Sequence, residues 1–273
     1  MTEAIITRQA NWTSAANKAL KLSTSFWLII AIIGQLAFVY YIAVHYGGAA
    51  ISGDKETVAA TTLKGHVSGD IAGNFFFISH ILMAATITLG GTLQLIPQIR
   101  KRAIGLHRWN GRVFLVTALA ISLGGFYLVW VRGATTSFLG SISVSLNGVL
   151  IMLCAVLTWH FVRRRDIARH RRWALRTFLL VNGVWFFRIG LFAWIILNQG
   201  PVGVGENFDG PFVITLGFAQ FVIPLAVLEL YLRVQDHGGA GAKFTMAAGL
   251  FALTALMALG IFGAFMFMWL PFL

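Results

Sequence analysis

Seven long apolar runs are the feature that most constrains how this chain can fold. Each run is close to the roughly 20 helical residues that cross a lipid bilayer, and each is continuously apolar, which favours helices over alternating strands. Hydrophobic residues make up 58% of the chain and charged residues only 11%. This apolar content is higher than the core of a soluble protein requires. We therefore predict an all-α polytopic membrane bundle of seven transmembrane helices, at residues 25–46, 72–97, 111–132, 144–162, 173–197, 211–232 and 244–270.

The basic residues predict how the helices are oriented. They gather in alternate loops, so the positive-inside rule places the N-terminus in the cytoplasm and the C-terminus outside, in a bacterial inner membrane. Because they border spans, we expect anionic lipid headgroups as partners and no nucleic acid. The basic residues expected inside are Arg8, Lys18, Lys21, Arg100, Lys101, Arg102, Arg108, Arg112, Arg163, Arg164, Arg165, Arg169, Arg171, Arg172 and Arg176, and those expected outside are Lys55, Lys64 and Arg132.

Two segments divide the chain. Residues 1–24 are polar and are predicted to be a cytoplasmic segment with a short amphipathic surface helix, on which Trp12 and Leu20 share the apolar side. Residues 25–273 are predicted to form one transmembrane domain. Its last span is almost without polar chemistry, but Gly260 and Gly263 would admit a close neighbour, and Trp269 is expected to anchor the outer interface.

An internal repeat borders two of the predicted hairpins. Residues 99–115 and 162–179 match at an offset of 63 residues, and after one inserted residue Trp109 and Arg112 correspond to Trp173 and Arg176. Both copies lie on the expected inner side. We interpret the repeat as a structural brace for the hairpins, with an anion or lipid site as the alternative.

Three polar side chains lie deep within the predicted spans. Ionisable groups in lipid are costly, so each is a candidate functional residue. His80, Arg188 and Gln220 fall at about one depth on the outer side of the midplane, given a rise of about 1.5 Å per helical residue. Pro224 would free the carbonyl of Gln220 from its helical hydrogen bond. We therefore predict a polar ligand pocket in the outer half of the bundle, lined by these three side chains, where an arginine without a carboxylate favours an anionic or carbonyl-bearing ligand.

The histidines raise the question of haem. A bis-histidine haem needs two imidazoles at matching depth on facing helices. His107 and His170 lie at the inner ends of the third and fifth spans and are further candidate cofactor-binding residues. For a metal, the candidates are His80 and His160, the second at the inner end of the fourth span. His107 and His170 also belong to arginine-rich turns, where bonding to lipid phosphates is an alternative role.

A combined motif runs through the second to fifth spans. It comprises His80 in a span that ends Gln94-Leu-Ile-Pro97, the segments Leu106-His-Arg-Trp-Asn-Gly-Arg112 and His170-Arg-Arg-Trp-Ala-Leu-Arg176, and Arg188 downstream. In these residues the chain resembles the DUF2306 family of bacterial membrane proteins of unknown function, over roughly the first six spans. It is also distantly similar to membrane cytochromes of the cytochrome b561 type. The first resemblance implies the architecture, and the second implies haem.

Three classes of function are compatible with the sequence. The chain is expected to be a membrane redox protein that binds haem b or a quinone, a carrier or receptor for a small anionic or lipid-like ligand, or an accessory subunit that contacts other membrane subunits. The sequence contains no recognisable nucleophile motif or phosphate-binding glycine loop, so whether the protein is an enzyme stays open.

Overall fold

The described part of the chain is almost entirely helical. The computed structural model describes residues 2–53 and 64–273, with side chains from residue 11 onward except Ala50, so Lys55 and the side chain of Arg8 lie outside the described part. The elements are α1 (Thr2–Tyr41), η1 (Ile42–Tyr46), α2 (Gly47–Ser52), α4 (Ile71–Leu95), α5 (Pro97–Arg102), α6 (Ile104–Trp130), α7 (Phe138–Arg163), α8 (Ile167–Val181), α9 (Gly183–Leu197), α10 (Pro211–His237), α11 (Ala240–Ala264), η2 (Phe265–Trp269) and η3 (Leu270–Phe272).

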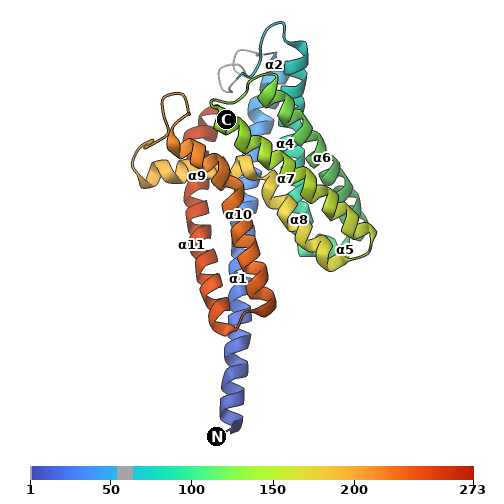
Figure 1. Cartoon of the computed structure of the whole chain (residues 1–273), viewed down its shortest axis with the longest axis vertical. Helices are drawn as coiled ribbons and strands as arrows, with labels where there is room; N and C mark the ends of the chain where they lie inside the picture. The colour runs from blue at the N-terminus through green and yellow to red at the C-terminus, as the bar shows by residue number, and fades with distance from the viewer. Residues whose placement is uncertain (1, 54–63) are drawn as a thin grey trace.

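The membrane-spanning architecture is confirmed. Among the described residues, six helices are long and apolar enough to cross a bilayer, and the pair α8 and α9 makes a seventh span if it is counted as one. This pair is bent by 55° at its break. The predicted fifth span, 173–197, is therefore a broken helix, and α9 leaves the direction of α8 in Figure 1.

The bundle has two chemically different ends. We call the end with the turns at 96–103 and 164–166 the basic end, and the end with residues 64–70, 131–137 and 198–210 the loop end. The helices α4, α6, α7 and α8 pack as one group, while α1 packs against α11 and α11 against α9 (Figure 1). That the basic end faces the cytoplasm stays a prediction from charge.

The N-terminal segment differs from its prediction. No separate surface helix forms, because residues 2–41 make one continuous helix. No glycine or proline interrupts residues 2–33, so nothing in the sequence breaks the helix before the span. The extension beyond the bundle is visible in Figure 1, and its Trp12 meets Phe244 of α11 edge to face at 5.9 Å. The segment thus contacts the start of α11 through Trp12, and through Asn17, which accepts a hydrogen bond from Lys243.

The last span packs closely against its neighbours. A Cβ added to Gly260 would lie 2.1 Å from the carbonyl oxygen of Ile189 in α9, and one added to Gly263 would lie 2.7 Å from a methyl carbon of Ile196. The predicted close approach at these glycines is therefore confirmed. Trp269 was expected at the interface, and this was wrong: its side chain is fully buried beside Phe38, at 5.5 Å between ring centroids. The helical turns after α11 direct it toward α1.

Candidate functional site

His80 and Arg188 lie within electrostatic range of each other, although they are more than 100 residues apart in the sequence. His80 belongs to the loop-end half of α4, and Arg188 belongs to α9. The two side chains interact electrostatically, and Arg188 also interacts with Tyr41 and Tyr46 at the loop end of the first span. We call these four residues the His80–Arg188 site. The structure thus brings together two of the three side chains that were expected to line one pocket.

The guanidinium of Arg188 lies in an aromatic environment. Its Cζ is 5.3 Å from the ring centroid of Phe38, and Nη1 donates to the carbonyl of Val184 in its own helix at 3.2 Å. Among the described residues no carboxylate pairs with it. Its Nε is buried and has no hydrogen-bond partner there. A cation–π contact and one carbonyl compensate only part of the cost of a charge in a low-dielectric medium, so the guanidinium keeps unused hydrogen-bonding capacity among the described residues.

The imidazole of His80 is also incompletely satisfied. Its Nδ1 is buried without a hydrogen-bond partner in the described part of the chain. On one side, Cε1 faces Gly125 of α6, where an added Cβ would lie at van der Waals distance, 3.7 Å. A buried polar nitrogen without a partner costs about 1–3 kcal/mol. The site therefore holds two buried nitrogens without partners among the described residues, and both could bond to a ligand.

The aromatic wall of the site comes from the first span. The side chain of Tyr41 is 4% exposed, and its ring meets that of Tyr46 edge to face at 6.0 Å. Tyr41 also packs at 6.3 Å from Trp269. These rings form part of the larger buried cluster between α1, α9 and α11, which gives the site a rigid apolar wall.

Gln220 does not join this site. It is 5% exposed, its Nε2 donates to the carbonyl of Gly217 at 2.8 Å, and its Oε1 is buried without a partner in the described structure. It lies instead beside Gly183 at the helix break, where an added Cβ would be 3.5 Å from Oε1 and 2.8 Å from Nδ2 of Asn147. Residues at the same depth in a membrane can point in different directions around their helix axes. Gln220 belongs to α10, which packs against α7, α8 and α9.

Carboxamide side chains surround the break between α8 and α9. Asn182 at the break accepts a hydrogen bond from Nε2 of Gln35 at 3.0 Å and donates to the carbonyl of Phe178 at 2.8 Å. Gln35 in turn accepts from the hydroxyl of Thr92 at 2.6 Å. On another side, Asn147 donates to the carbonyl of Leu180 at 3.2 Å. Side chains inserted into the helical hydrogen-bond ladder cause kinks, and here they satisfy backbone carbonyls at the bend.

The two repeat histidines also approach each other. His107, near the start of α6, and His170, near the start of α8, interact electrostatically at the basic end. Nδ1 of His170 lies 3.0 Å from the carbonyl oxygen of Thr158, and Nδ1 of His107 is buried without a partner in the described part. By contrast, His160 is exposed in the last turn of α7. It lies at the opposite end from His80, so these two candidate metal ligands are not brought together.

Sequence reasoning missed the ionic contacts of the membrane domain. Arg176 of the second repeat copy forms a two-pronged pair with Glu229 of α10, from Nε at 2.8 Å and from Nη2 at 2.9 Å. At the loop end, Arg132 is 7% exposed and lies 3.3 Å from the carboxylate of Asp70. It also donates to the carbonyl oxygen of Gly65 and to that of Gly73. Both contacts join segments that are distant in the sequence.

A simple signal could have indicated most of the missed residues. The carboxamides Gln35, Asn147 and Asn182 all fall within predicted spans, where polar groups need internal partners. The same holds for Arg176 and Glu229, which have opposite charges in two spans that cross the bilayer in opposite directions. Their pairing required only that the fifth and sixth spans be neighbours.

Comparison with known proteins identifies the family. The model of the family described as "Predicted membrane protein (DUF2306)" matches residues 77–232, which is more than half of the chain. The chain therefore belongs to this family, in agreement with the resemblance in its motifs. No curated protein and no solved structure matches the chain. The match runs from the second span to α10 and so includes His80, Arg188 and the helix break.

Proposed function

We propose that this DUF2306 protein is a membrane protein that binds a small carbonyl-bearing ligand of the quinone type at the His80–Arg188 site. The observation that carries the proposal is the pair of buried nitrogens, Nδ1 of His80 and Nε of Arg188, without partners among the described residues. A carbonyl oxygen accepts from such donors, and it is drawn to an uncompensated positive charge.

The surroundings of the site favour a flat, apolar ligand body. Phe38 and Tyr41 present aromatic rings beside the guanidinium, and aromatic rings pack well against one another in offset or edge-to-face arrangements. The membrane supplies ligands of this class directly from its apolar interior. In this proposal Arg188 donates a hydrogen bond to one carbonyl oxygen of the ligand, and His80 orients the ligand ring. Tyr41 and Tyr46 limit where that ring can lie.

A pair of variants tests binding at this site. The protein is purified in mild detergent, its quinones are extracted and quantified by mass spectrometry, and binding of an added short-chain ubiquinone is followed by tryptophan fluorescence. We expect wild type to bind the quinone and Arg188→Gln to lose at least tenfold in affinity. Because no carboxylate of the described residues pairs with Arg188, its replacement leaves none of them orphaned, so the variant should fold.

The matched control is Arg163→Gln, which removes an exposed arginine at the other end of the bundle. It should bind the quinone as wild type does. A wild-type protein that carries no quinone and binds none refutes the proposal, as does an unchanged affinity in Arg188→Gln.

A second candidate function is haem binding at the basic end, and the histidine pair of the repeat favours it. The carbonyl of Thr158 engages Nδ1 of His170, which leaves Nε2 for a metal, and His107 lies within electrostatic range. Two imidazoles suit a haem iron. No cluster of three or more metal-ligating side chains occurs among the described residues, so a tetrahedral zinc site has less support.

An absorption spectrum separates these proposals. Haem at the basic end predicts a Soret band that disappears in His107→Ala and in His170→Ala and persists in His80→Ala and His160→Ala. A band that depends on His80 would assign haem to the loop-end site instead. A colourless protein after haem supplementation would refute the haem proposal and leave the quinone proposal to its own test. We also propose the inner membrane of a bacterium as the location, which cell fractionation tests.

A further inference from the structure

The internal repeat provides a comparison between two equivalent arginines. Trp109 and Arg112 in α6 occupy the positions that Trp173 and Arg176 occupy in α8. Each arginine follows its tryptophan by three residues, which places both side chains on one helix face. A difference between the surroundings of Arg112 and those of Arg176 therefore indicates different roles for the two copies of the repeat.

In the second copy the charge is neutralised inside the protein. Arg176 forms two hydrogen bonds to Glu229, and its Cζ lies 4.6 Å from the ring centroid of Trp173. One turn earlier, Arg172 pairs with Asp236 of the same helix, α10. The second copy thus braces α8 against α10.

In the first copy the corresponding charge has no ionic partner in the described part of the chain. Arg112 is exposed, and no described carboxylate lies within ion-pair distance of it. The sequence explains this: no aspartate or glutamate occurs between Asp70 and Asp166, so α4, α6 and α7 cannot supply one. α6 packs against α4 and α7. Its arginine therefore remains available to an anion from outside the chain.

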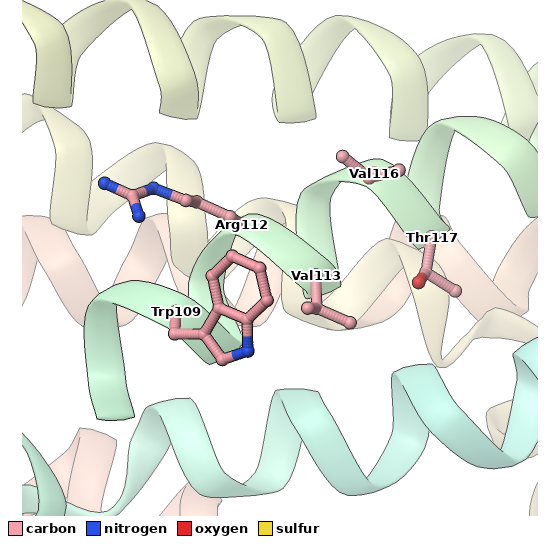
Figure 2. Close-up of a pocket in the computed structure, with 5 residues that line it drawn as sticks. All are labelled: Trp109, Arg112, Val113, Val116 and Thr117. Atoms are coloured by element: carbon pink, nitrogen blue, oxygen red, sulfur yellow. The ribbon is translucent and has the colours of Figure 1, made fainter. Parts of the chain in front are cut away.

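Arg112 lies at one end of an open groove. Together with Trp109, Val113, Val116 and Thr117 it lines a space of about 260 Å³ on the surface of α6 (Figure 2). Trp109 and Val116 are 64% and 67% exposed, on the part of the helix that faces lipid in a membrane. The groove is mostly apolar, with the guanidinium toward the basic end. This is the polarity of a phospholipid, with its phosphate at the interface and its acyl chain deeper.

The depth and the electrostatics of the groove agree with such an occupant. Arg112 lies eight residues into α6, about 12 Å along the axis at 1.5 Å per residue, and an arginine side chain extends back to the headgroup layer. The neighbouring helix α5 ends in three consecutive basic residues, Arg100, Lys101 and Arg102. Each basic residue near an anionic surface contributes attraction that falls off within a Debye length.

We infer that the groove on α6 binds one anionic phospholipid, with its phosphate on Arg112, its glycerol region beside the indole of Trp109 and an acyl chain along Val113 and Val116. The two copies of the repeat have thus diverged: one binds a carboxylate of its own chain, and the other binds a lipid phosphate. The site lies at the opposite end from the His80–Arg188 site and does not depend on it.

Native mass spectrometry of the full chain in mild detergent tests the inference. Phosphatidylglycerol or phosphatidylcholine is titrated in, and the first bound lipid is counted for wild type, Arg112→Gln, Arg112→Lys and Val116→Trp. We expect Arg112→Gln to weaken the first phosphatidylglycerol about tenfold and Arg112→Lys to weaken it less. Val116→Trp, which fills the groove and keeps every charge, should weaken it as well. Phosphatidylcholine, in which the choline cation offsets the phosphate charge, should bind wild type more weakly than phosphatidylglycerol and lose less in Arg112→Gln.

The control and the competitor separate this site from simpler explanations. Arg163→Gln removes an exposed arginine at the same end of the bundle but outside the groove, and it should leave phosphatidylglycerol binding unchanged. An equal loss in Arg163→Gln would mean general surface attraction and would overturn the inference. Competition by millimolar glycerol phosphate would indicate a soluble phosphate ligand and would also overturn it. Circular dichroism checks that Arg112→Gln folds. If it does not, the Val116→Trp variant decides, because unchanged phosphatidylglycerol binding in that variant would overturn the inference.

Discussion

Replacing Asn182 by leucine tests whether the carboxamide network maintains the helix break. Asn182 is 2% exposed and takes part in two hydrogen bonds, one from Gln35 and one to the carbonyl of Phe178. The leucine variant removes both and leaves a buried amide and a buried carbonyl unpaired, each at about 1–3 kcal/mol. Leucine's better helix propensity and apolar surface offset part of this cost. We expect a net loss of about 2–3 kcal/mol in the free energy of unfolding.

The pairwise contribution is measured by a double-mutant cycle with Gln35→Leu. When both partners become apolar, no orphaned amide remains between them, so the double variant should be less destabilised than the sum of the single variants by about 1–2 kcal/mol. Thr92 retains a hydrogen bond to the carbonyl of Thr88 at 2.8 Å, so its hydroxyl does not complicate the cycle. Unfolding by sodium dodecyl sulfate, followed by circular dichroism in mild detergent, gives the three values.

The matched control is Asn198→Leu, because Asn198 also donates to the carbonyl four residues earlier, at 2.9 Å, but in an exposed position. It should change the unfolding free energy by less than about 0.5 kcal/mol. Strictly additive single variants, or equal losses in Asn182→Leu and Asn198→Leu, would refute the reasoning that this network is a specific intramembrane contact.

Three further predictions concern packing and charge and are measured by the same unfolding assay, with hydrogen exchange added for the second. The pair of Arg176 and Glu229 should show a coupling of about 1–3 kcal/mol in a cycle of Arg176→Ala and Glu229→Gln, and additivity would mean that the pair contributes nothing. Arg132→Ala should cost about 2–3 kcal/mol and raise hydrogen exchange in residues 64–74, since it removes a buried clamp; unchanged exchange would contradict this. Gly260→Leu should destabilise by more than about 2 kcal/mol through overpacking against α9, whereas Gly249→Leu, which has open space around it, should not.

The agreement between sequence and structure differs from one part of the chain to another. Apolar run length predicted the six spans that form single helices, and it predicted the fifth span without its break. The small residues Gly260 and Gly263 indicated a close helix contact that the structure confirms. The prediction for Gln220 used depth alone. Depth follows from counting residues along one helix, but direction depends on how neighbouring helices are rotated, which the sequence pattern of an almost uniformly apolar span does not encode.

The repeat shows the same limit at the level of single charges. Its two copies are alike in sequence at Trp109 and Arg112 and at Trp173 and Arg176, and one structural role was expected for both. Only Arg176 meets a carboxylate, because α10 packs against α8 and brings Glu229 to it.

The sequence by itself determined that the chain spans a membrane, roughly which segments span it, and which few polar groups must be satisfied within lipid. These properties follow from local composition, since the bilayer imposes one length and one solvent on every span. Only the tertiary structure decided that Arg188 comes within electrostatic range of His80 while Gln220 lies at the helix break, and that one repeat arginine is paired while the other is exposed without a partner among the described residues. Those outcomes depend on which helix faces lie against each other, a property that arises only when all the spans pack together.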